Sequence, residues 1–430
     1  MNKKIVILGA GLSGLSIAYH LQNGCCVYEQ EGEVGGLART DEIDGFTFDY
    51  DGHLLHFKTD YVKKLIKKLL PGLFVPHNRN SWVFSHNVFT KYPFQANTYG
   101  LPSGVVKKCI LGMFDTVSKK KPPKEVNLAQ WMQHHFGEGI TKHFMYPYNH
   151  KFWTLAPEEL ISDWTQGFVP HVKLKTVLDG AFSLKTKSLG YNSEFWYPKV
   201  GGIDQIAKIL AKNINNIKTN YKMTGLELEN KKVFFENGES AKFTDLVLTT
   251  PLKALQKLIR DTLPKEVKQA FFSLKYVSIF NLNLGVQREN ISDKHWIYFP
   301  EDKFCFFRVG FPTNFSKNVA PRGTSSLYVE VSYSEFKQVD KRKIVSLIET
   351  DLVKSGILNP EDDILMRHIN DIKYGYVIYD KQYKHNIKII NDYLLKNNIY
   401  SAGRFGRWKY MSMEDVILDG KLISDLVKKK

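Results

Sequence analysis

The chain has 430 residues, of which 43% are hydrophobic and 24% are charged, and its formal net charge is +16. Such a length exceeds what one hydrophobic core supports, so we expect two or three cooperating domains in an ordinary globular protein. The charge allows anionic partners, but no basic stripe interleaved with aromatic residues supports nucleic-acid binding. Four cysteines show no metal-ligand spacing, which argues against a metal site and favours a reduced, cytoplasmic compartment.

The first predicted elements are a strand, a glycine-rich turn and a helix. Residues 4–8 indicate a short buried strand, and residues 16–22 show helical spacing. Between them, Gly9 suits a tight turn, Gly11 lets the backbone approach a pyrophosphate, and Gly14 lets the helix pack closely on the strand. The unpaired N–H groups at the helix N-terminus then bind the diphosphate of a dinucleotide. The cofactor-binding residues predicted in this turn are Gly9, Gly11, Leu12, Ser13 and Gly14.

The same N-terminal segment has a basic start and an apolar middle, so it also resembles a signal peptide. The three glycines at fixed offsets favour the nucleotide-binding turn instead. No other segment has the ~18 unbroken apolar residues of a membrane span. We therefore expect a cytoplasmic protein without an integral membrane span.

A second strand at residues 25–28 ends at Glu29, which stands 20 residues after Gly9. An acid at this distance accepts hydrogen bonds from the ribose hydroxyls of the dinucleotide. Because an acid rather than an arginine stands there, we expect FAD or NAD rather than NADP. Strand-like segments at residues 245–251 and 399–404 bring the chain back to the same sheet, so the cofactor domain is discontinuous.

Residues 33–40 carry a second glycine motif, Glu-Val-Gly-Gly-Leu-Ala-Arg-Thr. It resembles the second glycine motif of the large FAD-linked family that includes amine oxidases, protoporphyrinogen oxidase and UDP-galactopyranose mutase. In that motif the paired glycines let the backbone approach the dinucleotide, and the arginine offsets phosphate charge. FAD is thus the predicted cofactor, bound in part by Gly36, Leu37 and Arg39.

Four further segments extend this resemblance from residue 1 to about residue 420. In order and approximate spacing they look like segments of UDP-galactopyranose mutase, and in particular of its eukaryotic-type branch. The segments are residues 91–95, 144–153, 293–302 and 403–410. Within the second of them, Tyr148 and Phe152 are expected in the core rather than in the site.

This resemblance implies an isomerase. Members of that family bind FAD in its reduced state and interconvert the pyranose and furanose forms of a nucleotide sugar. Flavin N5 attacks the anomeric carbon and displaces the nucleoside diphosphate, and the resulting N5–sugar adduct opens and recloses to the other ring size without net redox change. A UDP-sugar substrate, NADPH or NADH as external reductant, and a supply of furanose donors for surface polysaccharide are therefore implied.

The resemblance also assigns residues to the site. His53, preceded by Gly52, matches a histidine on the loop beside the isoalloxazine ring, although Asp51 stands where the family usually has a second glycine. His53 and Arg308, which matches a diphosphate-binding arginine, are the predicted catalytic residues. The remaining implied cofactor-binding residues are Gly52, His53, Arg79, Gly403 and Arg404. The implied substrate-binding residues are Tyr92, Gln95, Phe144, Asn149, Trp153, Phe168, Asn192, Trp296, Tyr298, Tyr376 and Tyr410.

Two positions depart from the family's diphosphate site. The resemblance places an arginine where this chain has Phe168 and an asparagine where it has Glu414. A phenyl ring cannot replace a cation, and a carboxylate near a diphosphate repels it. Three explanations stay open: lysines of a mobile lid supply the charge, the nucleotide sugar sits differently, or the substrate is another nucleotide sugar, such as a deoxy or acetamido one. The candidate lysines are Lys173, Lys175, Lys185 and Lys187.

The predicted fold class is α/β, with a doubly wound Rossmann-type FAD domain, a helical insertion domain and an antiparallel β-sheet domain. The active site is expected in the cleft between these domains, over the flavin, and residues 185–190 are a candidate hinge for a flap. The sequence leaves the oligomeric state open, a homo-oligomer included. The expected boundaries are 1–60, 199–260 and 390–430 for the FAD domain, 98–190 for the helical domain, and 61–97 and 261–389 for the sheet domain.

An FAD-dependent oxidoreductase of the amine oxidase or protoporphyrinogen oxidase type is the alternative function, since it shares every motif of the N-terminal segment. A flavin-bound scaffold without catalysis is a third interpretation, prompted by Phe168 and Glu414. The pocket segments are not part of the generic cofactor signature, and they favour the mutase.

Overall fold

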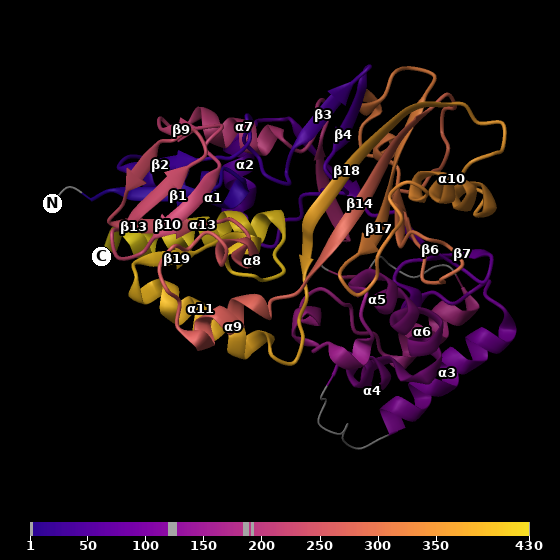
Figure 1. The fold of residues 1–430 in the computed structure, drawn as a ribbon. Helices are drawn as coiled ribbons and strands as arrows, with labels where there is room; N and C mark the ends of the chain where they lie inside the picture. Colours follow the sequence, from indigo (N-terminus) through magenta and orange to yellow (C-terminus); the bar gives the residue numbers. More distant parts are fainter. Residues whose placement is uncertain (1–2, 119–126, 184–188, 191–192, 430) are drawn as a thin grey trace.

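The computed structural model of the chain shows three parts (Figure 1): a parallel sheet with helices around it, a large twisted sheet, and a group of helices beneath the large sheet. The predicted α/β class with a Rossmann-type unit is confirmed by this arrangement. The structure describes residues 3–118, 127–183, 189–190 and 193–429.

Within the described residues, five strands form a parallel sheet in the order β19-β13-β1-β2-β9. Successive side chains of a strand point to opposite faces, so Ile5 and Ile7 of β1 enter one core while Val6 and Leu8 enter another. The strands are β19 (Ile399–Ser401), β13 (Asp245–Leu248), β1 (Ile5–Leu8), β2 (Cys25–Tyr28) and β9 (Ile217–Lys218).

Both faces of this sheet are covered, as its continuous apolar strands require. Helices cover the face of Ile5 and Ile7, and a small sheet with two further helices covers the opposite face. The helices of the first face are α1 (Leu12–Leu21), α7 (Gln205–Lys212) and α13 (Met413–Lys429). The opposite face holds β10 (Met223–Glu227), β11 (Lys232–Phe235), β12 (Ser240–Lys242), α9 (Lys265–Phe272) and α11 (Tyr383–Lys396).

The large sheet has the order β18-β14-β17-β16-β15-β6-β7 in the part of the chain that the structure describes. The predicted antiparallel pairing is confirmed for its neighbouring strands except β15 and β6, which run parallel. Helix α10 (Ile344–Lys354) packs on one face. The strands are β18 (Ile364–Val377), β14 (Tyr276–Val286), β17 (Ser325–Tyr333), β16 (Arg308–Gly310), β15 (Trp296–Tyr298), β6 (Ser81–Ser85) and β7 (Val88–Lys91).

The regular elements described between residues 98 and 190 are helical, and they share a hydrophobic core with the large sheet. These helices are α3 (Ser103–Ser118), α4 (Leu128–Ile140), α5 (Tyr146–Trp153) and α6 (Leu174–Phe182). Smaller elements connect the three parts: β3 (Thr40–Ile43), β4 (Phe46–Asp49), α2 (Asp60–Leu69), β5 (Phe74–Asn78), β8 (Glu194–Pro198), α8 (Leu252–Leu255) and α12 (Gly403–Gly406).

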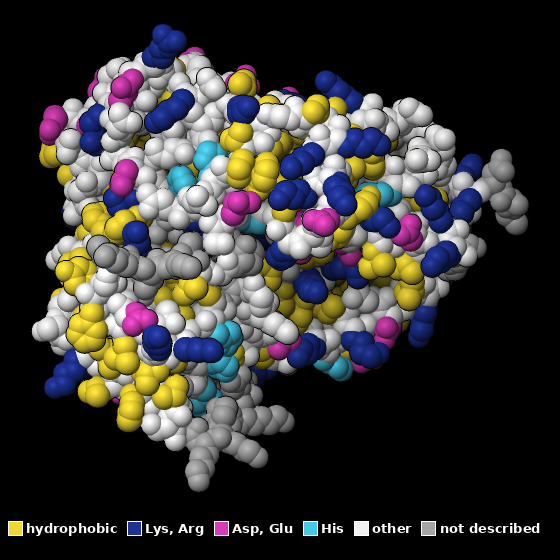
Figure 2. All heavy atoms as spheres, turned by 180° about the vertical axis from the view of Figure 1, so that it is seen from behind, with side chains coloured by type: hydrophobic (Ala, Val, Ile, Leu, Met, Phe, Trp, Pro, Cys, Tyr) yellow, Lys and Arg dark blue, Asp and Glu magenta, His cyan; other side chains and the backbone are white. Residues whose placement is uncertain are grey.

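The surface agrees with a charge that is scattered along the sequence. Seen from behind, lysine and arginine side chains are spread over the described surface among acidic ones, without one continuous basic stripe (Figure 2). Helices long and apolar enough for a membrane crossing do not occur among the residues described.

Lys151 fixes helix α5 against the loop that connects β15 to β16. Its side chain is buried, and its ammonium group donates hydrogen bonds to backbone carbonyls of this loop. The accepting oxygens are those of Phe299 (2.9 Å), Glu301, Phe304 (3.0 Å) and Phe306 (3.3 Å). Because Tyr298 and Arg308 stand at the two ends of the same loop, Lys151 positions predicted site residues from both the helix and the sheet.

We expect Lys151→Met to remove a pH-dependent part of the stability. Burial lowers the pKa of Lys151 to about 7 from its ordinary value of 10.5. Between these pH values the unfolded chain keeps a proton that the folded chain has released, so this group raises the free energy of unfolding as the pH rises through the window. The slope is at most about 1.4 kcal/mol per pH unit.

Denaturant unfolding at neutral pH and about two units above it checks this expectation. Lys151→Met should gain less stability than wild type over that interval, whereas Lys242→Met, at an exposed lysine of β12, should follow wild type. Parallel pH curves for all three proteins would show that Lys151 does not titrate in this window.

Candidate functional site

A cavity of about 740 Å³ is lined by residues from the parallel sheet, the large sheet and the helices. It brings together most of the site residues that the sequence predicts. Gly14, Arg79, Gln95, Trp153 and Gly403 stand outside its lining as the described residues define it, and Asn192 lies outside the described residues. The predicted residues that line it are Gly9, Gly11, Leu12, Ser13, Glu29, Gly36, Leu37, Arg39, Gly52, His53, Tyr92, Phe144, Asn149, Phe168, Trp296, Tyr298, Arg308, Tyr376, Arg404 and Tyr410.

The turn between β1 and α1 has the close approach that the three glycines predict. A Cβ atom on Gly14 would lie 2.0 Å from the carbonyl oxygen of Gly9, so a side chain is excluded where the helix packs on the strand. The second glycine motif lies against this turn, since a Cβ on Gly36 would lie 3.1 Å from the Cα of Gly11. Glu29, at the end of β2, accepts a hydrogen bond of 2.6 Å from the backbone N–H of Ala10. The two motifs therefore form one cradle of exposed backbone.

Several buried polar atoms in this cavity have no hydrogen-bond partner among the described residues. They are Ser13 Oγ, Arg39 Nε, His53 Nδ1, Trp164 Nε1, Trp296 Nε1, and Nε and Nη2 of Arg404. Such orphaned buried groups are rare in proteins and require a partner. A dinucleotide fits this set: Ser13 and Arg39 would hold its pyrophosphate, Glu29 its ribose, and His53 and Arg404 would face its flavin ring. The residues present thus fit FAD.

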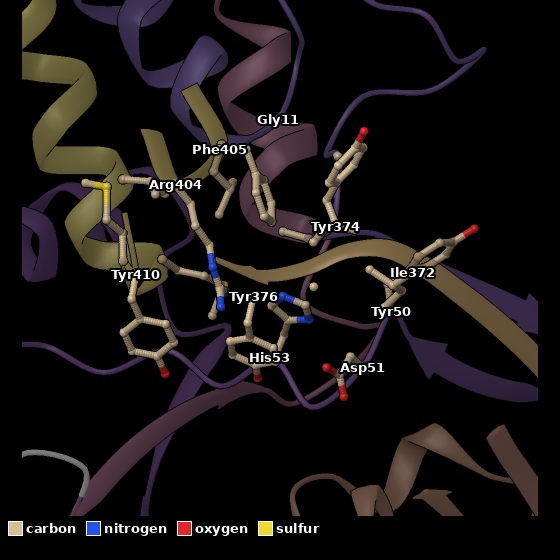
Figure 3. Close-up of a pocket in the computed structure, with 18 of the residues that line it drawn as sticks. Gly11, Tyr50, Asp51, His53, Ile372, Tyr374, Tyr376, Arg404, Phe405 and Tyr410 are labelled. Carbon is tan, nitrogen blue, oxygen red and sulfur yellow. The ribbon is translucent and has the colours of Figure 1, made fainter. Parts of the chain in front are cut away.

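His53 lies on a loop in which the preceding residue, Gly52, has no room for a side chain. A Cβ on Gly52 would lie 2.4 Å from the hydroxyl oxygen of Tyr328. Burial lowers the pKa of His53, Asp51 opposes this shift, and Arg404 adds to it. The imidazole is therefore neutral near neutral pH and can donate or accept one proton. Figure 3 shows His53 beside Tyr376, with Asp51 on the same loop and Arg404 above.

Arg308 does not face the cavity as an isolated cation. It lies directly opposite Glu330 in the β16–β17 pair, and its guanidinium donates two hydrogen bonds to that carboxylate, one of them 2.6 Å long. Asp51 Oδ1 lies 3.8 Å from the guanidinium. Burial raises the pKa of the fully buried Glu330 well above its ordinary range; Arg308 opposes this shift and Asp51 adds to it. The guanidinium of Arg308 thus faces two carboxyl groups in one cluster.

Arg404 lines the cavity, and its Nε and Nη2 atoms have no hydrogen-bond partner among the described residues. Its guanidinium carbon lies 4.5 Å from the ring centre of Tyr376 and 4.9 Å from that of Tyr410. These two rings stack 5.9 Å apart, and burial raises the pKa of both phenols. Both hydroxyls therefore stay protonated near neutral pH and can donate hydrogen bonds to an anion.

Aromatic rings form the opposite wall. Tyr92 packs 4.9 Å from Tyr298 and lies under the guanidinium of Arg79, which explains why Arg79 stands behind the lining. Tyr148 and Phe152, which were expected in the core, pack against the hydrophobic core and also line the cavity.

Two of the implied substrate residues lie behind this wall. Trp153 is 1% exposed and donates a hydrogen bond of 3.2 Å to Asn149, which itself reaches the cavity. Gln95 is equally buried and donates to the carbonyl oxygen of Pro170 at 2.9 Å. In this arrangement both residues support the wall instead of forming its surface.

The two departures from the family differ in their consequences. Phe168 lines the cavity, with its ring 4.7 Å from that of Tyr410. Glu414, expected to repel a diphosphate, is fully buried and accepts hydrogen bonds from the backbone and hydroxyl of Thr59. That expectation was wrong, because this carboxylate is directed into the protein at the start of α2.

The lysines offered as replacement cations do not lie in the described part of the site. Lys173 and Lys175 are exposed beside α6 and are absent from the cavity lining that the described residues form. Lys185 and Lys187, and most of the candidate hinge at 185–190, lie outside the described residues.

Sequence reasoning missed Tyr328 and Glu330 on β17. Tyr328 lines the cavity, and Glu330 holds Arg308. The signal was present in the sequence, since Glu330 is a single carboxylate in the strand Ser-Ser-Leu-Tyr-Val-Glu-Val-Ser-Tyr. A charge inside an apolar strand requires a buried partner. Groups of three or more metal-binding side chains do not occur among the described residues.

Comparison with solved structures shows the same architecture over the whole chain. A crystal structure of reduced UDP-galactopyranose mutase is 27% identical, with a TM-score of 0.95, and the match covers 100% of this chain and 94% of that one. Cyclohexylamine oxidase from Brevibacterium oxydans, 13% identical with a TM-score of 0.71 and a coverage of 100% and 99%, shares the fold.

Curated relatives by sequence are L-amino-acid oxidases of snakes. That of Sistrurus catenatus edwardsii is 34% identical over 161 residues, or 30% of this chain and 31% of the relative. That of Bothrops pauloensis is 24% identical over 310 residues, or 64% and 58%. The match thus spans less than two thirds of the length of either relative. The model of the family described as flavin containing amine oxidoreductase matches residues 12–427. Because this match covers nearly the whole chain, the protein belongs to the flavin-containing amine oxidoreductase family.

Proposed function

We propose that this protein is an FAD-dependent nucleotide-sugar mutase that interconverts pyranose and furanose ring forms, with a UDP-sugar of the UDP-galactopyranose type as its substrate. The observation that carries the proposal is that one cavity joins the glycine cradle to the residues that the resemblance assigns to the nucleotide sugar. The 27% identity with reduced UDP-galactopyranose mutase over the whole chain supports it.

The side chains of the cavity suit a diphosphate leaving group. The phenols of Tyr376 and Tyr410 stay protonated and can donate hydrogen bonds, and Arg404 between them brings an uncompensated charge. Arg308, on β16 of the same large sheet as Tyr376, offers further guanidinium hydrogens. Such donors stabilise the negative charge that develops as the glycosidic bond to the diphosphate breaks.

Reduced FAD, when bound, would supply the nucleophile for the anomeric carbon. The task of the chain is then to hold the sugar above the ring and exclude water, for which Trp296, Tyr298 and Phe144 provide apolar surface. His53, neutral and without a partner on Nδ1 among the described residues, can hold or move a proton beside the ring. We place the enzyme in the cytoplasm, where NADPH or NADH would reduce the flavin and the product would serve as a furanose donor for surface polysaccharide.

An oxidoreductase acting on an amine or a related substrate is the second candidate. The family match and the partial identity with L-amino-acid oxidases favour it. Unlike the mutase, it consumes one oxidant for each product. The number of turnovers per reducing equivalent therefore separates the two functions.

The test is to incubate dithionite-reduced holoprotein with UDP-galactopyranose and follow the ring form by chromatography. We expect many turnovers for each reducing equivalent, no consumption of oxygen, and much lower activity with oxidised flavin. A panel of other UDP-, dTDP- and GDP-sugars defines the sugar and the base. If no nucleotide sugar changes ring form, or if each product requires one oxidant, the mutase proposal is wrong.

A further inference from the structure

The cavity wall lacks an arginine at residue 168, but a cation lies directly behind it. Phe168 presents its ring to the cavity and packs edge to face on Tyr410. On the ring of Phe168 lies the ammonium nitrogen of Lys58, 4.9 Å from its centre. A lysine over an aromatic face is attracted by the negative charge of the ring. At the position where the resemblance places a guanidinium, the ammonium group of Lys58 therefore lies against the ring that lines the cavity.

The second departure explains why Lys58 lies there. The buried carboxylate of Glu414 accepts a hydrogen bond of 2.6 Å from the backbone N–H of Lys58 and one of 2.8 Å from that of Thr59. It also accepts one from the Thr59 hydroxyl at 2.6 Å. These bonds fix the backbone just before α2, from which the side chain of Lys58 extends to the ring of Phe168. Glu414 and Phe168 thus belong to one local rearrangement.

The ammonium group of Lys58 can change partners. It lies 3.3 Å from both carboxylate oxygens of Asp415. Oδ2 of this carboxylate also accepts hydrogen bonds from the backbone N–H and the hydroxyl of Ser412. The side chain of Lys58 is 33% exposed, so its ion pair with Asp415 is weakened by solvent. A lysine is a point charge on a flexible stem, and it can turn from this pair to a nearby anion.

A further cation would stabilise a diphosphate in this cavity. A nucleoside diphosphate brings several negative charges, whereas Glu330 and Asp51 already balance the guanidinium of Arg308. Arg404 would have to serve the flavin as well as the diphosphate. Tyr410 and Ser412 line the cavity beside Phe168, so the position of Lys58 is on the diphosphate side that the resemblance implies.

We propose that Lys58 binds the diphosphate of the substrate and takes the part of the arginine that the resemblance places at residue 168. Phe168 serves as the platform on which the ammonium group rests, and Glu414 is a positioning residue that acts through the backbone of Lys58. This inference rests on the proposed function, because it presupposes a nucleotide-sugar substrate.

The test measures binding of UDP and of uridine to oxidised holoprotein through the change in flavin absorbance. Lys58→Ala should weaken UDP binding about ten- to hundredfold, as expected for a lost charge-assisted hydrogen bond, and leave uridine binding unchanged. The salt dependence of UDP binding should also decrease. A purely structural role would weaken both ligands together.

Rescue and control variants make the test specific. Adding Phe168→Arg to Lys58→Ala should restore UDP binding, because it returns a cation to the cavity wall. Lys63→Ala is the matched control: Lys63 is on α2, the helix that follows Lys58, and also lies on an aromatic ring, 5.3 Å from the centre of Trp196. It should bind UDP like wild type.

The contradicting outcomes differ for the two proposals. If wild type binds UDP but Lys58→Ala binds it equally well, or loses uridine to the same extent, or is not rescued by Phe168→Arg, Lys58 is not the diphosphate ligand. If wild type binds neither UDP nor any UDP-sugar, the proposed function fails and this inference fails with it.

Discussion

Replacing Arg308 with alanine is expected to lower isomerisation by about 10²–10³-fold or more while FAD stays bound. The guanidinium lies on the cavity wall, and its loss removes donors for the charge that develops on the diphosphate. The change also removes the cation that is paired with Glu330 and Asp51, so the wall loses its attraction for an anion. Turnover of the reduced enzyme and the flavin absorbance of the purified variant measure the two parts of this expectation.

The matched control for this substitution is Arg288→Ala. Arg288 is likewise held by a carboxylate, with its guanidinium 2.7 Å from Asp362, but it is absent from the cavity lining that the described residues form. It should keep wild-type turnover. Wild-type activity in Arg308→Ala would instead remove this residue from the predicted catalytic set and direct attention to Arg404.

The cofactor cradle was predictable because its constraints are local. The fixed offsets of Gly9, Gly11 and Gly14 determine a turn of a few residues between a strand and a helix, and the structure has the close contacts that such a turn requires. The α/β class follows from the same pattern of strands and helices. Trp296 and Tyr298 reach one cavity because they alternate along one strand.

The rest of the site depends on contacts between residues far apart in the sequence. Glu414 was expected near a phosphate, but its carboxylate is buried and accepts hydrogen bonds from the backbone of residues 58 and 59. Arg308 was predicted as a diphosphate ligand without its partner Glu330, because the pair forms only when β16 and β17 come into register. The sequence alone does not show which residues of β16 and β17 lie opposite each other. The ion pairs of a site are therefore harder to predict than the types of residue that line it.

The second large effect that we expect is on the free energy of unfolding, and it depends on the ion pair of Arg308 and Glu330. We expect Glu330→Ala to lower the free energy of unfolding of the holoprotein by about 3–5 kcal/mol, since it leaves the guanidinium of Arg308, whose side chain is only 18% exposed, without its acceptors. Unfolding in denaturant, followed by circular dichroism, measures the loss. Glu236→Ala, which removes an exposed ion pair of 2.8 Å with Lys222, should leave the free energy of unfolding nearly unchanged.

A double-mutant cycle separates this partnership from a general loss of packing. If the two side chains stabilise each other, the double variant Arg308→Ala/Glu330→Ala should lose about 0.5–3 kcal/mol less than the sum of the two single losses. Strict additivity would mean that the cross-strand pair adds nothing beyond the volume of its side chains. A net coupling, together with tighter UDP binding in Glu330→Gln than in wild type, would show that Glu330 has two opposite effects. Its carboxylate stabilises Arg308 within the sheet, and the same carboxylate weakens the attraction of Arg308 for a phosphate.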